Sequence, residues 1–248
     1  MDLNNLYKRK FVATLNRIFV SFIIISIIIL PLYFLWYPYP LNHALEVNKL
    51  VGFIIIINTG LAGLFTFFFY DSNRKDNNLN MKLITFIQIL VFIYGFYYFV
   101  QIRPAWLVQH EDRINIIQPA FIVYPVDMSF LDKLMIQSWG KPQFKTVKFS
   151  EIPLKRQLQV FQSTEGAGIE YQPLEYISYD ADFSLKYSKT LSELVIYNNE
   201  DEVKEILNSY SKTERWLPLR SSLNGQDMVV LINGKGEVLG VVNLKPWN

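Results

Sequence analysis

The sequence predicts an α+β membrane protein, in which three N-terminal transmembrane helices precede a single α+β domain. Two observations support this prediction. Three long runs without a formal charge occupy the first 102 residues, whereas the remaining residues mix charged and apolar side chains in patterns typical of short strands and helices. We expect a cytoplasmic N-terminus at 1–17, a transmembrane region at 18–102 and one α+β domain at 103–248, long enough to bury one core.

The first uncharged run has 28 residues and lies between Arg17 and Glu46. A helix rises about 1.5 Å per residue and the hydrocarbon core of a bilayer is about 30 Å thick, so about 20 apolar residues cross it. Two further runs of that length follow. We therefore expect three spans, at about 18–38, 51–70 and 83–102.

Basic residues flank these runs unevenly, and their distribution predicts the orientation. By the positive-inside rule, we expect the N-terminus and the 71–82 loop in the cytoplasm, and 41–49 and the C-terminal domain outside. In a Gram-negative cell this places the protein in the inner membrane with a periplasmic domain. The flanking basic residues are Lys8, Arg9, Lys10 and Arg17 before the first run, Arg74, Lys75 and Lys82 around the second connection, and Lys49 in the intervening loop.

Small and polar residues interrupt the second and third runs. Small residues let helix backbones approach, and an intramembrane amide usually finds a partner across a helix interface. This face is either a docking face for another membrane protein or a packing face among the three helices. The candidate residues are Asn58, Gly60, Gly63, Thr66 and Gln88. At the end of the first run, Trp36, Tyr37 and Tyr39 predict an interfacial aromatic belt.

The C-terminal half has two hairpin signals. Strands are expected at 105–109 and 113–118, around a charged turn, and at 228–232 and 237–244. The second pair is joined by 233–236, where Asn-Gly is expected to supply the positive φ angles that tight hairpin turns need.

Two segments have the spacing of amphipathic helices. The first is 151–163, and we expect it to end at the glycines in 165–168. The second begins after Asn199, which is expected to form a capping pair with Glu202.

Composition and motifs argue against several function classes. There are no cysteines and only two histidines, His43 and His110, which make a poor metal site. The C-terminal half has 16 basic and 18 acidic residues, so it lacks the basic excess of a nucleic-acid binder. Nucleophile elbows, zinc-binding H-E-x-x-H motifs and phosphate-binding glycine loops are also missing from the sequence. We expect no catalysis, no cofactor and no metal.

The segment 58–66 reads Asn-Thr-Gly-Leu-Ala-Gly-Leu-Phe-Thr, which is similar in register to a D-x-x-L-G-P-L-L-T pattern. That pattern is found in the second span of the type IV pilin accessory proteins, the TfpX/TfpZ group. Asn58 stands in place of the acid, Ala62 in place of glycine and Gly63 in place of proline. Asn80 and Met81 stand where relatives tend to have Asp and Leu. Matches elsewhere are Lys75, Gln88, Tyr94, Gly95, Arg103, Pro104, Asp112, Arg113, Leu217, Pro218, Leu219, Pro246 and Trp247.

The resemblance implies an inner-membrane, chaperone-like accessory protein that binds the major type IV pilin and supports its stability or assembly into pili. A pilin in the bilayer has one apolar helix and one exported head, so its partner needs a membrane face and an exported face. In the exported part, Arg103, Asp112, Arg113 and Trp247 could be structural, with an ion pair that fixes the first hairpin to the membrane exit. The alternatives are a membrane-anchored periplasmic enzyme or sensor for a small molecule or cell-wall fragment, and a structural subunit of a larger membrane machine.

Overall fold

The structure of the protein, a computed structural model, divides into two compact units. The helical unit comprises Met1–Phe34 and Val47–Gln101, and the α+β unit comprises Leu35–Glu46 and Ile102–Asn248. The structure describes residues 3–70, 77–221 and 225–247, and the side chains from residue 7 onward. Arg74 and Lys75 of the expected cytoplasmic loop therefore lie outside the described residues.

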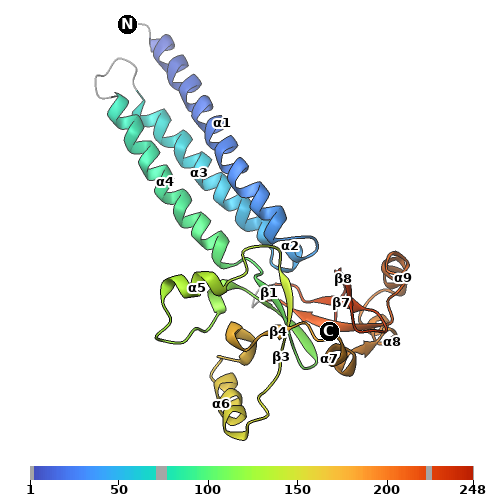
Figure 1. Ribbon diagram of the computed structural model, residues 1–248. Coiled ribbons are helices and arrows are strands. Elements are labelled where there is room, and N and C mark those ends of the chain that lie inside the picture. Colours follow the sequence, from blue (N-terminus) through green and yellow to red (C-terminus); the bar gives the residue numbers. More distant parts are fainter. Residues whose placement is uncertain (1–2, 71–76, 222–224, 248) are drawn as a thin grey trace. The chain divides into compact units, whose positions relative to one another are not determined.

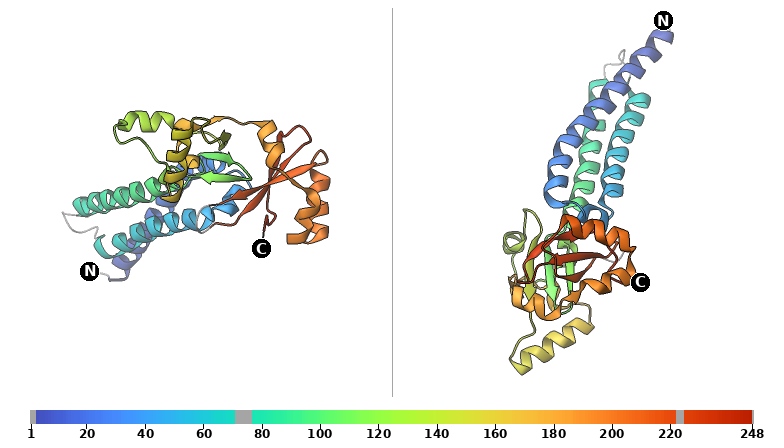
Figure 2. Two further views of the ribbon diagram at one scale, coloured as in Figure 1. Left: turned by 90° about the horizontal axis from the view of Figure 1, so that it is seen from below. Right: turned by 90° about the vertical axis from the view of Figure 1, so that its right-hand side faces the viewer.

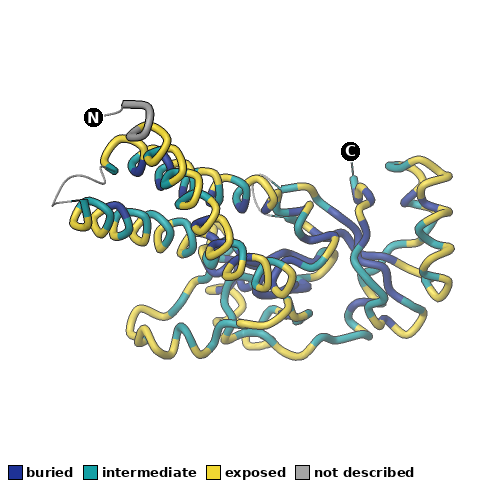
Figure 3. Tube along the Cα trace, turned by 90° about the horizontal axis from the view of Figure 1, so that it is seen from above, coloured by how far each residue is buried: buried dark blue, intermediate teal, exposed yellow. Residues whose placement is uncertain are grey.

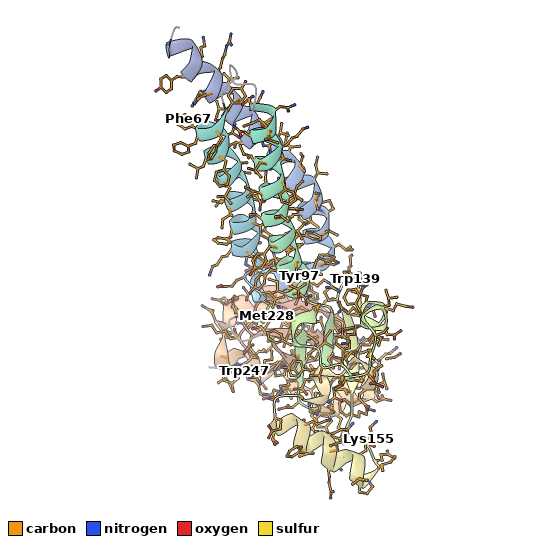
Figure 4. The ribbon with its side chains drawn as sticks, turned by 90° about the vertical axis from the view of Figure 1, so that its left-hand side faces the viewer. Phe67, Tyr97, Trp139, Lys155, Met228 and Trp247 are labelled. Carbon is orange, nitrogen blue, oxygen red and sulfur yellow. The ribbon has the colours of Figure 1, made fainter. Side chains whose placement is uncertain are left out.

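The helical unit consists of three long apolar helices (Figure 1). They are α1 (Leu3–Trp36), α3 (Val47–Phe69) and α4 (Asn77–Gln101), and each has a stretch long and apolar enough to cross a membrane. Together with the α+β unit that follows, these helices confirm the predicted fold class. The outward surfaces of all three helices are largely exposed (Figure 3), and Phe67, labelled in Figure 4, is one of the exposed apolar side chains of α3. Such apolar surfaces suit a lipid environment.

Helices α3 and α4 lie close together along much of their length, whereas α1 approaches them over a shorter stretch. Gly95 of α4 permits this close approach, because a Cβ there would lie 3.2 Å from a side-chain carbon of Ile54 on α3. Small residues at helix crossings in membranes have this general effect.

The α+β unit is built around one mixed sheet with the strand order β4-β3-β1-β2-β6-β7-β8. Strand β5 pairs with the first residues of β6, and β2 pairs in parallel with its last residues. The strands are β1 (Trp106–His110), β2 (Arg113–Ile117), β3 (Gln143–Val147), β4 (Ile177–Ser178), β5 (Lys189–Thr190), β6 (Arg215–Arg220), β7 (Met228–Ile232) and β8 (Val238–Val242).

Short helices surround this sheet (Figure 2). They are α2 (Leu41–Ala44), η1 (Pro119–Phe121), α5 (Phe130–Ile136), α6 (Pro153–Thr164), η2 (Ile169–Tyr171), η3 (Pro173–Glu175), α7 (Ala181–Tyr187), α8 (Leu191–Tyr197) and α9 (Glu200–Ser209). Both helices predicted from amphipathic spacing are confirmed as α6 and α9. Gly166 ends α6 with a φ of 81°, and the side chain of Asn199 caps α9 by accepting the amide of Asp201.

Both predicted hairpins are present. Strands β1 and β2 pair antiparallel, and so do β7 and β8. The expected backbone geometry of the second turn was wrong, because the positive φ, 78°, occurs at Gly236. The side chain of Asn233 instead organises the turn by accepting the amides of Lys235 and Glu237, each at 2.9 Å.

The core of the α+β unit lies on both faces of β7, all of whose residues are buried. Met228, Val230 and Ile232 belong to one apolar cluster, and Val229 and Leu231 belong to a second cluster on the opposite face. A strand buried on both faces has a continuous apolar run, as this one does. Helices α8 and α9 contribute to the second cluster.

The segment 35–46, which joins α1 to α3, is part of the α+β unit. Leu41 and Ala44 are buried in the same cluster as Met228, and the carbonyl of Ala44 accepts the amide of Gln226 at 2.9 Å. Residues 35–38 were expected as the end of the first span, and 41–46 only as part of a short external loop. The chain therefore completes its C-terminal core with residues that lie between its first two apolar helices.

The predicted aromatic belt needs correction for two of its three residues. Trp36 and Tyr37 are buried in the α+β unit, and the indole of Trp36 donates to the carbonyl of Trp139 at 2.8 Å. Tyr39 remains exposed. Amphipathic aromatic residues suit both a membrane interface and a protein core, so the sequence could not separate the two environments.

Candidate functional site

A groove of about 350 Å³ lies among the three helices of the helical unit. Its walls are mostly apolar and include Val20, Ile24 and Ile28 of α1 and Phe92 of α4. The α1 side chains on this wall are accessible from outside the protein. The groove is thus open along α1 to whatever surrounds the helices.

Polar side chains from α1 and α4 meet in this groove. The guanidinium of Arg17 donates to the hydroxyl of Thr85 at 2.6 Å and to the side-chain oxygen of Gln88 at 3.1 Å. The amide nitrogen of Gln88 donates to the hydroxyl of Ser21 at 2.6 Å. These hydrogen bonds join α1 to α4 where their backbones are not closely packed.

Arg17 has only neutral partners in this cluster. None of the three helices contains an aspartate or glutamate, and Arg17 forms no ion pair with any residue that the structure describes. Its Nε is also buried without a hydrogen-bond partner. Charged side chains that reach in among membrane helices usually pair with an opposite charge or line a functional path.

Asn58 lies at the centre of α3 and faces the same groove, with its side chain 1% exposed. Its amide nitrogen donates to the carbonyl of Ile54 at 3.0 Å, but its side-chain oxygen has no hydrogen-bond partner. A buried acceptor without a donor is costly, and such exceptions call for an explanation.

The structure separates the five membrane residues predicted as one face. Asn58 and Gln88 line the groove. Gly63 faces α1, since a Cβ there would lie 2.7 Å from the Cδ1 of Ile18, and Thr66 is also buried. Gly60 is exposed, with open space around the position of a Cβ. Helix positions two apart do not share a face, which explains why Gly60 and Asn58 diverge.

Arg17, Ser21 and Thr85 were missed as site residues. Arg17 was assigned to the basic flank that sets orientation, although it ends the charged segment and begins the first apolar run. The signal was its spacing of four residues from Ser21, matched by the spacing of three from Thr85 to Gln88. Both spacings place two polar groups on one side of an apolar helix.

Arg103 lies at a second polar centre, inside the α+β unit. Its guanidinium donates to the side-chain oxygen of Gln137 at 3.0 Å and to the carbonyl of Ser138 at 3.1 Å. It also lies over the rings of Trp139 and Trp36, at 4.2 and 5.4 Å from the centroids. Burial lowers the pKa of Arg103 to about 10, so the group stays charged at neutral pH.

The other residues of the predicted family pattern are distributed over both units. Tyr94 is exposed on α4 beside Gly95, while Pro104 and Pro246 are buried in the α+β unit. The indole of Trp247 donates to Asp227 at 2.9 Å. Asp112 lies in the turn between β1 and β2, and Arg113 begins β2. No ion pair forms at Asp112 within the described part of the chain, so the expected tie between the first hairpin and Arg103 is wrong.

Helix α6 exposes an apolar face. Leu154, Leu158 and Phe161 are spaced four and three residues apart and are 78, 55 and 61% exposed. The helix projects from the sheet (Figures 1 and 2). Its Lys155, labelled in Figure 4, pairs with Glu175 at 2.8 Å. The residues described contain no group of three His, Cys, Asp or Glu placed to hold a metal ion.

The fold and the groove define a class of protein, a membrane-anchored α+β protein with a mostly apolar groove among its helices that contains a few polar side chains. Three relatives specify it further, all from Dichelobacter nodosus. The fimbrial assembly protein of serogroup I is 24% identical over 210 residues, which cover 81% of this chain and 82% of the relative. That of serogroup E1 is 24% identical over 222 residues, which cover 86% of each chain. That of serogroups C1 and C2 is 32% identical over 94 residues, which cover 37% of this chain and 72% of the relative.

The chain therefore belongs to the family of these fimbrial assembly proteins. This confirms the pilus accessory family that the residue patterns predicted. No family model matches the chain, and no solved structure matches it.

Proposed function

We propose that the protein acts in type IV pilus assembly as an inner-membrane accessory factor that binds the major pilin and supports its stability or its entry into the fibre. Membership of the fimbrial assembly family supports the role in assembly. The observation that supports binding of a membrane partner is the open groove in which Arg17 and Asn58 have incomplete partners. The proposed role is one of binding and needs no catalytic step.

A membrane contact and an exported contact would act together. In the membrane, Asn58 and Gln88 face the groove and remain the best of the predicted contact residues, while Gly60 could contact a partner only on the outer surface of α3. Outside the membrane, the apolar face of α6 offers a surface for a globular partner. Two contacts on one partner raise the overall affinity, because the second forms at a high effective concentration.

The proposed orientation has the N-terminus and the 71–82 loop in the cytoplasm and the α+β unit in the periplasm. The segment 41–49 has one basic residue, Lys49, against four in the segment 8–17. A periplasmic reporter fused after Asn248 should be active, and a cytoplasmic reporter should be silent. The opposite result would remove the proposed contact with an exported pilin head.

The function is tested by gene deletion and by co-purification in mild detergent. We expect deletion to lower pilin abundance or the number of surface pili, and the tagged protein to retain the major pilin. Normal pili in the deletion strain would contradict the proposal. Stable retention of secretion-machine components without pilin would instead favour a structural subunit. Normal pili together with altered response to a cell-wall fragment would favour an enzyme or sensor.

A further inference from the structure

The membrane groove has an uncompensated positive charge, and this charge indicates what kind of occupant fits it. The guanidinium of Arg17 contacts the neutral oxygens of Thr85 and Gln88, and the three helices supply no carboxylate. Long basic side chains near the end of a membrane helix usually extend to the interface, where water solvates them. Here the side chain reaches Thr85 and Gln88, the third and sixth residues of the third apolar run.

Asn58 distinguishes a helix from a lipid as the occupant. At about 1.5 Å per residue, Gln88 lies about 8 Å inside the third apolar run, which begins at Leu83, so the charge of Arg17 alone would also suit a lipid phosphate. Asn58 is the central residue of α3. Phosphate groups of lipids lie at the interfaces, outside a hydrocarbon core about 30 Å thick, and acyl chains have no polar group. An occupant that meets both Arg17 and Asn58 must therefore have a charged group and, further into the bilayer, a polar group on an apolar scaffold.

The second incomplete group sets a further requirement. Asn58 lines the groove, and its buried side-chain oxygen lacks a donor. Its own amide nitrogen is engaged by the carbonyl of Ile54, so the missing partner must donate a hydrogen bond. A hydroxyl, amide or amino group on the same scaffold would complete it.

From these features we infer that the groove receives a transmembrane helix of a partner protein that carries one carboxylate, which pairs with Arg17, and a nearby hydrogen-bond donor for Asn58. The groove volume, about 350 Å³, suits side chains from one face of a helix. Val20, Ile24 and Phe92 provide apolar walls for the rest of that face. The inference rests on the proposed function for its biological setting, and it specifies the chemistry of the partner.

Synthetic transmembrane peptides provide the test. The probe is a 22-residue leucine-alanine helix with one Glu about five residues from one end, at the depth of Gln88, and the control is the same helix with Gln. The full-length protein is reconstituted in zwitterionic lipid nanodiscs and labelled at a single introduced cysteine, which is unique because the natural chain has none. Energy transfer to the peptide reports binding. We expect the Glu peptide to bind about tenfold more tightly than the Gln peptide.

Variants then assign this preference to Arg17. Arg17→Gln should remove the preference, and Arg17→Lys should retain part of it, because the charge remains but its second hydrogen bond is lost. Arg9→Gln is the matched control, since it removes an exposed charge from the same helix, and it should leave the preference intact. Equal binding of both peptides to the parent protein would overturn the inference, whatever the folding of the variants.

Two outcomes keep this inference distinct from the proposed function. If the parent protein retains pilin in detergent and Arg17→Gln retains as much, the inference fails while the function stands. If the Glu peptide binds as expected but pilin is not retained, the function fails while the groove chemistry stands. Adding anionic lipid tests the remaining occupant: loss of the Glu preference at a moderate phosphatidylglycerol content would show a lipid site and overturn the inference.

Discussion

Replacing Leu41 by Ala tests whether the segment between the first two apolar helices belongs to the core of the α+β unit. Leu41 is 3% exposed and lies in a cluster with Leu107, Leu217 and Met228. Truncation of a buried leucine to alanine removes buried apolar contacts and leaves a cavity, at a cost of about 2–5 kcal/mol. We expect a loss of about 3 kcal/mol in the free energy of unfolding of this unit.

Tryptophan fluorescence during urea unfolding in detergent is a suitable assay. All five tryptophans lie in the α+β unit, with Trp36 at the end of α1, so the signal reports mainly on this unit. With a slope of about 2 kcal/mol per molar urea, the expected loss lowers the midpoint by about 1.5 M. Tyr39→Ala is the control, because Tyr39 is 76% exposed on the same segment, and it should change the midpoint by less than about 0.25 M.

The reasoning would be refuted if Leu41→Ala and Tyr39→Ala gave the same midpoint as the parent. That result would mean that the segment does not pack in the core, and that the C-terminal residues fold without it. If the segment does pack there, a fragment that begins at residue 103 should be less stable than the same unit in the whole chain, since it lacks Leu41 and Ala44.

Three further predictions concern the helices and one surface ion pair. Gly63→Leu should lower the melting temperature in detergent, because its Cβ would lie 2.7 Å from an α1 side chain and overpacking costs about 1–3 kcal/mol. Gly60→Leu is the control and should leave the melting temperature unchanged, since the space around position 60 is open. Equal melting temperatures of the two variants would contradict this packing. Asn58→Leu should stabilise the free protein by about 1 kcal/mol, because it removes a buried acceptor that has no donor. The same variant should retain less pilin in detergent. Unchanged pilin retention would show that Asn58 is not part of the contact. Hydrogen bonds from Lys148 and a backbone amide lower the pKa of Asp180 in the folded protein. The contribution of Asp180 to stability is therefore complete above the ordinary pKa of 3.8, and it is lost as the pH falls through the lower pKa of the folded state. Asp180→Asn should reduce the acid dependence of unfolding, and an unchanged pH profile would show that this ion pair contributes nothing measurable.

The broad architecture was predictable because a bilayer imposes a simple requirement on sequence. Each crossing needs about 20 residues without charges, and the three runs meet it independently of tertiary contacts. The strands were predictable for a similar reason, as β7 is a continuous apolar run and the turn residues around it have strong local preferences.

The groove was not predictable from local patterns, because its hydrogen bonds join residues far apart in the chain. Arg17 meets Gln88 across 71 positions, and its charge had a sufficient local explanation as part of the basic flank. The burial of Trp36 and Leu41 likewise depends on strands that come much later in the chain. Periodicity shows which residues share a helix face, but it does not show which partner that face meets.

The most direct test of a pilin contact in the groove is in-cell photocrosslinking from Ile24. This side chain lines the groove and is 53% exposed, whereas Ile56 on α3 is 69% exposed outside it and serves as the control position. In piliated cells, a photoreactive residue at position 24 should capture the major pilin, position 56 should capture little, and Arg17→Gln should reduce the yield at position 24. Absence of a pilin adduct at position 24, or equal yields at both positions, would contradict the proposal that the groove holds the pilin helix.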